Sequence, residues 1–392
     1  MRILEFIKQN CKNVEFHALG DVCDFLKTST LSKDKLIENG EFPVVNSSKE
    51  FYGYYDKFNN DGNTICVASR GNAGFVSYVE QKFWAGGLCY PFRSKNENNI
   101  NTKFIFYFLK SKENSIISNL VSFGAIPALN KSDLQNFKIP VPSLEVQNKI
   151  VEVLDSFSSL VRSLVREKTA REKQYKYYLN HLITNARNSR IYKLGEVCEI
   201  KGRIGFRGYT TADMVKENQG AITLSPRNII NQKIDFSDLQ FISWAKYEES
   251  PEIMIFENDV VFCKTGSTLG KVAIIENLPQ KTTLNPQLVV FKNIKCNNRF
   301  LYYVVSTENF QSKAQSLKGV GAVSNISQGN LANIEFPLPP LDEQERIVRI
   351  LDSLNELANG LSAGIPKEIE LRQKQYEYWR DRLLEFPSKD SK

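Results

Sequence analysis

Residues 138–157 read KIPVPSLEVQNKIVEVLDSF, and residues 335–354 read EFPLPPLDEQERIVRILDSL. Aligned without a gap, the two stretches are identical at nine of twenty positions. Unrelated stretches of ordinary composition would share about one. The chain therefore contains an internal duplication, and a protein with two similar halves is suited to a target that also has two halves.

The duplication extends through each half in the same order. A phrase of the form L-G-[DE]-V-C begins at Leu19 and again at Leu194, and an aromatic stretch at residues 103–107 returns at 299–303. The separation of equivalent residues grows from 175 to 197, so we expect extra loop in the second half, mostly between residues 201 and 260. A period this long indicates duplicated domains, because solenoid repeats are about 20 to 50 residues long.

Each half has the pattern of a mixed α/β domain. Short apolar runs bounded by Gly, Asn and Ser, as at residues 64–68 and 259–263, predict strands. Later stretches at residues 102–109 and 298–305 predict a helix packed on that sheet. The predicted fold class is α/β, with two such domains in a pseudo-two-fold repeat.

After each Pro-x-Pro phrase, apolar residues recur at spacings of four and three, the pattern of a coiled-coil seam. In the first copy Lys168 and Arg171 interrupt this seam, which otherwise continues through Tyr178 and Leu182. Residues 363–366 should break the second helix, because they end in Pro. Since neither helix can bury its stripe alone, we expect them to pair antiparallel between the two domains. Helices of about 25 residues would span roughly 38 Å, close to one turn of B-DNA.

Composition excludes several classes of protein. Hydrophobic residues at 42% and charged residues at 24% are typical of a soluble globular chain. The net charge of +7 permits a polyanionic partner without requiring one. No apolar run is long enough to cross a membrane and no signal peptide is recognisable, so we expect a cytoplasmic protein without a membrane partner. Seven cysteines without a C-x-x-C pair, beside two histidines, predict buried thiols and no metal site.

Three strings resemble catalytic signatures incompletely. Residues 266–271 are one residue short of a phosphate loop, and Val272 replaces the Ser or Thr that holds magnesium. Residues 285–288 lack the second Pro and the aromatic residue of the amino-methyltransferase motif. Asp61 with residues 80–82 fits only a loose nuclease pattern. We therefore expect a chain that catalyses no reaction and has no catalytic residues.

Each half also carries two Gly-containing stretches flanked by basic or hydrogen-bonding residues. Gly lets the backbone approach a phosphate, and Arg, Lys, Asn and Ser reach base edges or phosphate oxygens. The alternative interpretation is an ordinary set of surface loops. Residues 201–209, with three cations in seven positions, are the strongest candidate. The candidate DNA contacts are Ser69, Arg70, Asn72, Asn130, Lys131, Lys201, Arg203, Arg207, Tyr209, Arg227, Lys264, Thr265, Ser267, Lys318, Ser324 and Asn325.

At the repeated phrase P-x-P-x-L-[ED]-x-Q-x-[KR]-I-V, the chain resembles the specificity subunit of a type I restriction-modification enzyme. Residues 140–151 and 337–348 match the blocks that follow each target recognition domain in that family. The resemblance implies that each domain reads one half of a bipartite double-stranded DNA site, while the paired helices set the gap and dock methyltransferase subunits. Restriction (motor-nuclease) subunits join that core. No cofactor is expected on this chain, because S-adenosylmethionine, ATP and Mg²⁺ belong to the partner subunits.

The resulting expected boundaries are recognition domains at residues 1–143 and 187–341 and helical spacers at residues 144–186 and 342–392. Two alternatives remain open: a self-sufficient DNA modification or restriction enzyme, and a structural coiled-coil adaptor. The domains share little sequence beyond the framework, so we expect different half-sites. The candidate spacer and methyltransferase-docking residues are Gln147, Ile150, Leu154, Tyr175, Gln344, Ile347, Leu351 and Tyr376.

Overall fold

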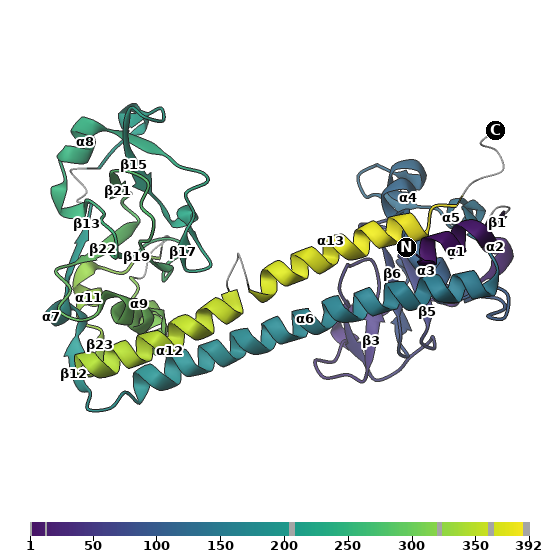
Figure 1. Cartoon of the computed structure of the whole chain (residues 1–392), viewed down its shortest axis with the longest axis horizontal. Helices are drawn as coiled ribbons and strands as arrows, with labels where there is room; N and C mark the ends of the chain where they lie inside the picture. Colours follow the sequence, from purple (N-terminus) through teal and green to yellow (C-terminus); the bar gives the residue numbers. More distant parts are fainter. Residues whose placement is uncertain (1, 12–13, 204–207, 320–323, 360–363, 387–392) are drawn as a thin grey trace. The chain divides into compact units, whose positions relative to one another are not determined.

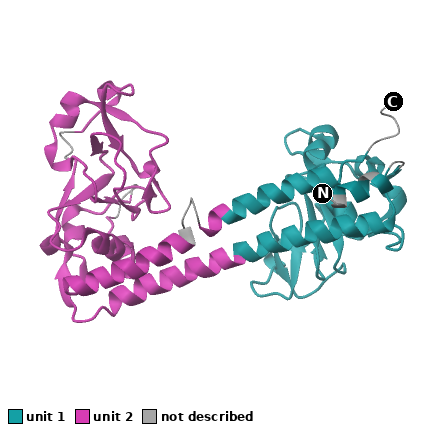
Figure 2. Ribbon diagram, viewed as in Figure 1, with its two compact units in different colours: residues 1–165, 368–392 teal, residues 166–367 magenta. Residues whose placement is uncertain are grey.

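The computed structural model describes residues 2–11, 14–203, 208–319, 324–359 and 364–386. The chain divides into two compact units, which Figure 2 colours separately. The first unit comprises residues 1–165 and 368–392, and the second comprises residues 166–367. Helix α6 (Leu144–Thr184) belongs to both, because the division falls inside it.

A four-stranded antiparallel sheet forms the centre of the first unit. Its strands, in spatial order, are β2 (Cys23–Phe25), β8 (Cys89–Ser94), β5 (Thr64–Ala68) and β6 (Val76–Val79). Every residue of β5 is buried, as expected for a central strand covered on both faces. Helix α3 (Thr102–Ser111) packs on this sheet, where Phe104 joins Ile65 in one apolar core. The predicted strand and helix are confirmed.

Smaller elements complete the first unit. A three-stranded sheet has the order β4 (Gly53–Tyr55), β3 (Phe42–Val45) and β7 (Trp84–Ala85), with β3 and β7 parallel. Two antiparallel pairs join β1 (Glu15–Ala18) to β11 (Lys138–Val141) and β9 (Val121–Ser122) to β10 (Ala128–Leu129). The short helices are α1 (Arg2–Asn10), α2 (Leu19–Val22), α4 (Glu113–Leu120) and α5 (Lys131–Asn136).

The second unit repeats this plan. Its main sheet has the antiparallel order β13 (Glu199–Gly202), β22 (Leu288–Lys292), β19 (Val260–Cys263) and β20 (Val272–Ile274). Helix α9 (Asn298–Ser306) takes the place of α3, and β12 (Arg190–Lys193) pairs with β23 (Glu335–Leu338) as β1 pairs with β11. The short helices are α7 (Leu194–Val197), α8 (Trp244–Glu248), α10 (Glu308–Ser316) and α11 (Gln328–Ala332).

The extra residues of the second half are not mainly loop, as the sequence suggested. They contribute to a further four-stranded sheet and a small hairpin. The sheet has the order β14 (Met214–Val215), β18 (Phe241–Ser243), β15 (Gly220–Leu224) and β21 (Thr282–Leu284). The hairpin joins β16 (Ile229–Ile230) to β17 (Lys233–Ile234). These strands are only two to five residues long, so their local sequence pattern was weak.

Long helices pair within each unit. In the second unit, α6 and α12 (Leu341–Asn359) share an apolar core that contains Tyr175 and Ile347, and they lie side by side in Figure 1. In the first unit, Leu154 of α6 and Leu383 of α13 (Ile365–Leu383) share the other core. Two contacts show that α6 and α12 are antiparallel, as predicted. Burial and the charge of Asp352 raise the pKa of Tyr175, and the Arg187 N–H donates to the Glu343 carboxylate. The later residue of one segment therefore lies near the earlier residue of the other.

The geometry of the long helices departs from the expectation in two respects. Helix α6 has 41 residues, more than the expected 25 or so, because it continues through Lys168 and Arg171 without a break. The buried stripe beyond this point runs through Leu179 and Ile183, one position after the predicted residues Tyr178 and Leu182. A straight helix drifts in this direction relative to a seven-residue repeat. The predicted break is confirmed, since α12 ends before Pro366 and α13 begins around it. The break's first residue, at position 363, lies outside the described residues.

The repeated phrase L-G-[DE]-V-C begins with one turn of helix in both units. Its first four residues form α2 in one unit and α7 in the other. Both cysteines that follow are buried. Burial raises the pKa of Cys23 and of Cys198 to about 12, as expected for inert packed thiols.

Candidate nucleic-acid interface

Two of the predicted loops lie side by side in the first unit. The Gly71 N–H donates to the Pro127 carbonyl at 3.0 Å, and the Leu129 N–H donates to the Ser69 carbonyl at 2.9 Å. Arg70 and Ala128 form an isolated β-bridge between them. Residues 69–74 and 122–131, here named the first loop pair, therefore form one continuous surface.

The second unit joins its equivalent loops in the same way. The Gly266 N–H donates to the Ser324 carbonyl at 2.7 Å, and the Ile326 N–H donates to the Lys264 carbonyl at 2.9 Å. The Thr265 hydroxyl donates to the Asn325 side-chain oxygen at 2.8 Å. Residues 264–268 and the described part of residues 318–326 form the second loop pair. The sequence predicted each loop but not their contact.

Both loop pairs depend on a glycine in the same conformation. Gly71 has φ +70° and Gly266 has φ +89°, in the left-handed region that other residues adopt at a cost. In each case this glycine donates the hydrogen bond that crosses to the partner loop. The glycines therefore fix the register of the two loops.

Side chains with hydrogen-bonding groups project from these loops. In the first pair, Arg70, Asn72, Asn130 and Lys131 are exposed, whereas Ser69 is buried. Asn72 also donates to the Ser47 carbonyl at 2.8 Å, and the Lys131 ammonium lies 5.1 Å from the Phe25 ring centre. In the second pair, Ser267, Lys318 and Asn325 are exposed, and Lys264, Thr265 and Ser324 are half-buried. Burial lowers the pKa of Lys264.

The structure adds two residues that sequence reasoning missed. Phe123 is 70% exposed and Ile126 is 62% exposed, both in the first loop pair. Two exposed apolar side chains close together in one loop form a small apolar patch, and aromatic rings can stack on bases. The sequence could have indicated them, because Phe and Ile lie close to Gly124 in a stretch predicted to be a surface loop.

The strongest sequence candidate is corrected in part. Arg203 is only 4% exposed, and its guanidinium donates to the Leu284 carbonyl at 3.2 Å and to the Thr283 hydroxyl at 3.3 Å. The guanidinium carbon also lies 5.3 Å from the Tyr209 ring centre. Burial lowers the pKa of Arg203. This side chain holds the second unit together and is not an exposed DNA contact.

The remaining basic candidates have different surroundings. Lys201 pairs with Glu199 at 2.8 Å, and exposed Arg227 pairs with Asp238 at 3.6 Å. Arg207 lies outside the described residues, as do positions 320–323 of the second loop pair. The Lys201–Glu199 and Arg227–Asp238 ion pairs are partly exposed to solvent. Each cation can therefore exchange its carboxylate partner for a phosphate.

The Gln shared by both copies of the repeated phrase has a structural role in each unit. Gln147 is buried, accepts from the Asn101 N–H at 2.8 Å and donates to the Pro142 carbonyl at 2.7 Å. Gln344 is also buried. It accepts from the Asn297 N–H at 2.9 Å and donates to the Pro339 carbonyl at 2.8 Å. Each Gln therefore fastens the start of a long helix to the start of α3 or α9.

This burial corrects the docking hypothesis. Seven of the eight candidate residues are buried in their own unit, so they attach the spacer to its domain and leave no surface for a partner: Gln147, Ile150, Leu154, Tyr175, Gln344, Ile347 and Leu351. The eighth, Tyr376, is half-buried against the first core. The phenolic oxygen of Tyr175 is buried and has no hydrogen-bond partner among the described residues.

The structure shows the surroundings of two of the three incomplete catalytic strings. Lys271, the lysine of the phosphate-loop-like string, donates to the carbonyls of Pro226 and Ile229 at 3.1 and 2.9 Å. Asp61, Glu80 and Lys82 line one open pocket of the first unit. In the part of the chain that the structure describes, no three metal-ligating side chains are grouped. The same residues include no helix with the length and apolar character of a membrane span.

Comparisons with known proteins agree on one family. The model of the type I restriction modification DNA specificity domain matches residues 11–171 and 187–371. The specificity subunit of a type I restriction enzyme from Escherichia coli is 30% identical over 96% of both chains, and a putative one from Haemophilus influenzae is 25% identical over 95% of this chain and 96% of its own. In fold, the chain is similar to the crystal structure of a type I restriction-modification S subunit from M. genitalium, with TM-score 0.61, 18% identity and 96% of both chains covered. The chain belongs to the family of type I restriction-modification DNA specificity subunits.

Proposed function

We propose that this chain reads a bipartite DNA site for a type I restriction-modification complex, with one loop pair for each half-site. The observation that carries the proposal is the recurrence of the loop pair. Each unit has one, joined by equivalent backbone hydrogen bonds around an equivalent glycine. A duplicated scaffold with two presenting surfaces matches a target with two separate parts.

The side chains on the two loop pairs favour different half-sites. Arg70, Asn72 and Phe123 are exposed on the first pair, and Ser267, Lys318 and Asn325 on the second. Arg pairs with guanine and Asn with adenine through two hydrogen bonds each, whereas Ser is less selective. The backbone geometry is thus shared while the groups that reach base edges differ.

The long helices are proposed to separate the half-sites and to dock methyltransferase subunits, with restriction subunits joining them. Since the repeated Gln and the apolar stripe are internal, docking falls to exposed helix residues. Tyr177, which is 60% exposed and stacked on His181 in α6, is the clearest such group. A cytoplasmic location follows from this role, because the target is the cell's DNA.

Chemistry is proposed to reside on the partner subunits. In this proposal, S-adenosylmethionine, ATP and Mg²⁺ bind to those subunits and not to this chain. A self-sufficient enzyme would itself bind the methyl donor, so titration of the isolated chain with S-adenosylmethionine separates the two hypotheses. A structural adaptor would not bind DNA, whereas a reader that neutralises several phosphates should lose affinity steeply between about 50 and 200 mM salt.

Methylome sequencing tests the function directly. The chain is expressed with a type I methyltransferase subunit in cells that lack other such systems. The expected result is methylation at one two-part motif, with two different specific parts and a fixed gap. Methylation at a continuous motif, or none beyond a control without this chain, would refute the proposal.

A further inference from the structure

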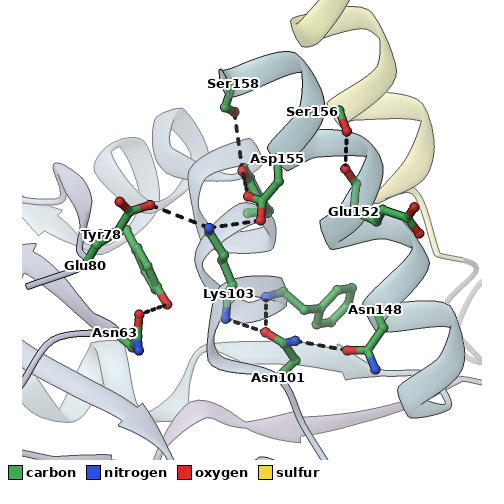
Figure 3. Close-up of polar contacts among 12 residues, drawn as sticks. Asn63, Tyr78, Glu80, Asn101, Lys103, Asn148, Glu152, Asp155, Ser156 and Ser158 are labelled. Atoms are coloured by element: carbon green, nitrogen blue, oxygen red, sulfur yellow. Dashed lines mark hydrogen bonds and ion pairs between the residues drawn. The ribbon is translucent and has the colours of Figure 1, made fainter. Parts of the chain in front are cut away.

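A second attachment joins the recognition domain to its helix in the first unit. Lys103 of α3 lies between two carboxylates, as Figure 3 shows. Its ammonium is 2.9 Å from the Asp155 carboxylate of α6 and 3.6 Å from the Glu80 carboxylate. Tyr107, one turn further along α3, donates from its hydroxyl to Asp155 at 2.5 Å. Two side chains of the domain thus converge on one carboxylate of the long helix.

The second unit repeats this arrangement with one exchange of residue type. Arg299 of α9 donates from Nε to the Asp352 carboxylate of α12 at 2.6 Å, and its terminal nitrogen bonds to Glu276. Tyr303 donates to the same Asp352 oxygen. Each residue stands 196 or 197 positions after its counterpart in the first unit. We name the two sets, Lys103–Tyr107–Asp155 and Arg299–Tyr303–Asp352, the joint clusters.

The joint clusters are partly shielded from solvent, which makes their bonds worth more than surface ion pairs. The side chains of Lys103 and Asp155 are 24% and 34% exposed, and those of Arg299 and Asp352 are 33% and 35% exposed. Burial and the bond to Asp155 raise the pKa of Tyr107, so its hydroxyl remains a donor. For Arg299, burial lowers the pKa, but the bonds to Asp352 and Glu276 outweigh burial and raise it overall.

Each joint cluster stands a fixed distance from the Gln attachment. Asp155 follows Gln147 by eight residues, and Asp352 follows Gln344 by eight. Eight residues of α-helix cover about 12 Å. Apolar contacts such as those of Ile150 and Leu154 lie between the two points. Hydrogen bonds are directional, so polar attachments at both ends of this apolar contact fix the direction of the domain on its helix.

We infer that the joint clusters are positioning residues, which hold each recognition domain at a fixed angle on its helix and thereby define the gap between the half-sites. This inference rests on the proposed function. Neither cluster belongs to a loop pair, so the clusters are not expected to affect which bases are read. Their loss should broaden the range of gaps and leave the half-site sequences unchanged.

The test uses the full chain assembled with its methyltransferase subunits. A library of random-sequence duplexes is bound, and the retained duplexes are sequenced, which gives half-site sequences and the gap distribution together. Asp155→Asn and Asp352→Asn, singly and combined, remove the charge with little change in shape. The double variant should raise the share of duplexes with a gap one base pair longer or shorter roughly tenfold, since charge-assisted bonds are about twice as strong as neutral ones.

Matched controls come from the chain itself. Lys103→Arg and Arg299→Lys each install the cation of the other unit and should keep a single gap. Lys168→Met removes an ion pair of 3.1 Å with Glu172 that lies within α6 alone, so the gap should again stay single. A broadened gap for Lys168→Met would show that the loss of any charge on the helix broadens the gap. That result would contradict the inference.

Three further results decide the matter. A double Asp variant that keeps the wild-type gap distribution, or that changes the half-site bases, overturns the inference while the proposed function stands. If the wild type retains no two-part motif, both are overturned. If the Asp variants do not fold, Tyr107→Phe and Tyr303→Phe replace them, and an unchanged gap in their combination also overturns the inference.

Discussion

The two units are most alike where a domain meets its helix and least alike in their smaller sheets. The buried Gln, the joint cluster and the glycine of the loop pair recur with nearly equal geometry. By contrast, the first unit has a small three-stranded sheet where the second has a four-stranded one. The duplicated halves therefore share the attachments and the main sheet, and they differ in the smaller sheets.

Loss of the buried Gln should have the largest effect and should be nearly equal in the two units. Gln147→Ala and Gln344→Ala each remove the partner of a backbone N–H and of a proline carbonyl, and Gln147→Ala also releases the Asn99 carbonyl. Each loss costs about 3 kcal/mol of unfolding free energy. Urea unfolding of each variant measures this cost. Gln81→Ala, at an exposed position, should leave unfolding unchanged. A large cost in only one unit would break the equivalence.

Replacement of Arg203 should destabilise the second unit alone. Arg203→Met removes the donors to Leu284 and Thr283 from a buried place, at a cost of about 2 kcal/mol. Thermal unfolding followed by hydrogen exchange of each unit locates the change. Arg227→Met, at an exposed position, is the control. If Arg203→Met unfolds like the wild type and only DNA binding weakens, Arg203 is a contact residue after all.

Alanine at each loop-pair glycine should weaken the selection of one half-site and leave the other unchanged. Gly71→Ala and Gly266→Ala force a left-handed conformation on a residue with a side chain, which costs about 1–2 kcal/mol. Added Cβ atoms would meet nothing closer than 3.8 and 3.6 Å, so the cost is conformational and not steric. We expect each variant to weaken selection of a different half-site, read by sequencing retained duplexes. Gly124→Ala, in open space at an ordinary φ, should have no effect.

Single exposed cations should have the smallest effect. Lys131→Ala and Arg227→Ala are expected to change the free energy of unfolding by less than about 0.5 kcal/mol. If each contacts a phosphate, the slope of log affinity against log salt should fall by about 1 without a change in the preferred sequence. Fluorescence anisotropy over a salt series measures this slope. A changed base preference would instead assign the residue to base reading.

Local patterns in the sequence were enough for the framework. Alternating and buried apolar runs placed β5 and β19, and Pro366 placed the break between α12 and α13. These features depend on neighbours within a few residues, so a single sequence contains them. The duplicated phrase also identified the Gln as important, although not its bonds to the start of α3 and α9.

Contacts between residues far apart in the sequence could not be predicted from local patterns. An arginine is usually a surface residue, so the sequence alone suggested that Arg203 is exposed. Its hydrogen bonds to residues 80 and 81 positions away place it in the core. The pairing of residues 69–74 with 122–131, and the second small sheet, likewise depend on chain segments far apart. The one-residue shift of the seam at Leu179 arises from helix geometry accumulated over several turns.

Variants of the two loop pairs test most directly whether each unit reads its own half-site. Duplexes retained by the full chain with its methyltransferase subunits are sequenced for the wild type, Arg70→Ala and Asn325→Ala. We expect a two-part motif for the wild type, with base preference lost in one part for Arg70→Ala and in the other part for Asn325→Ala. A continuous motif, or two variants that lose the same part, would contradict this expectation.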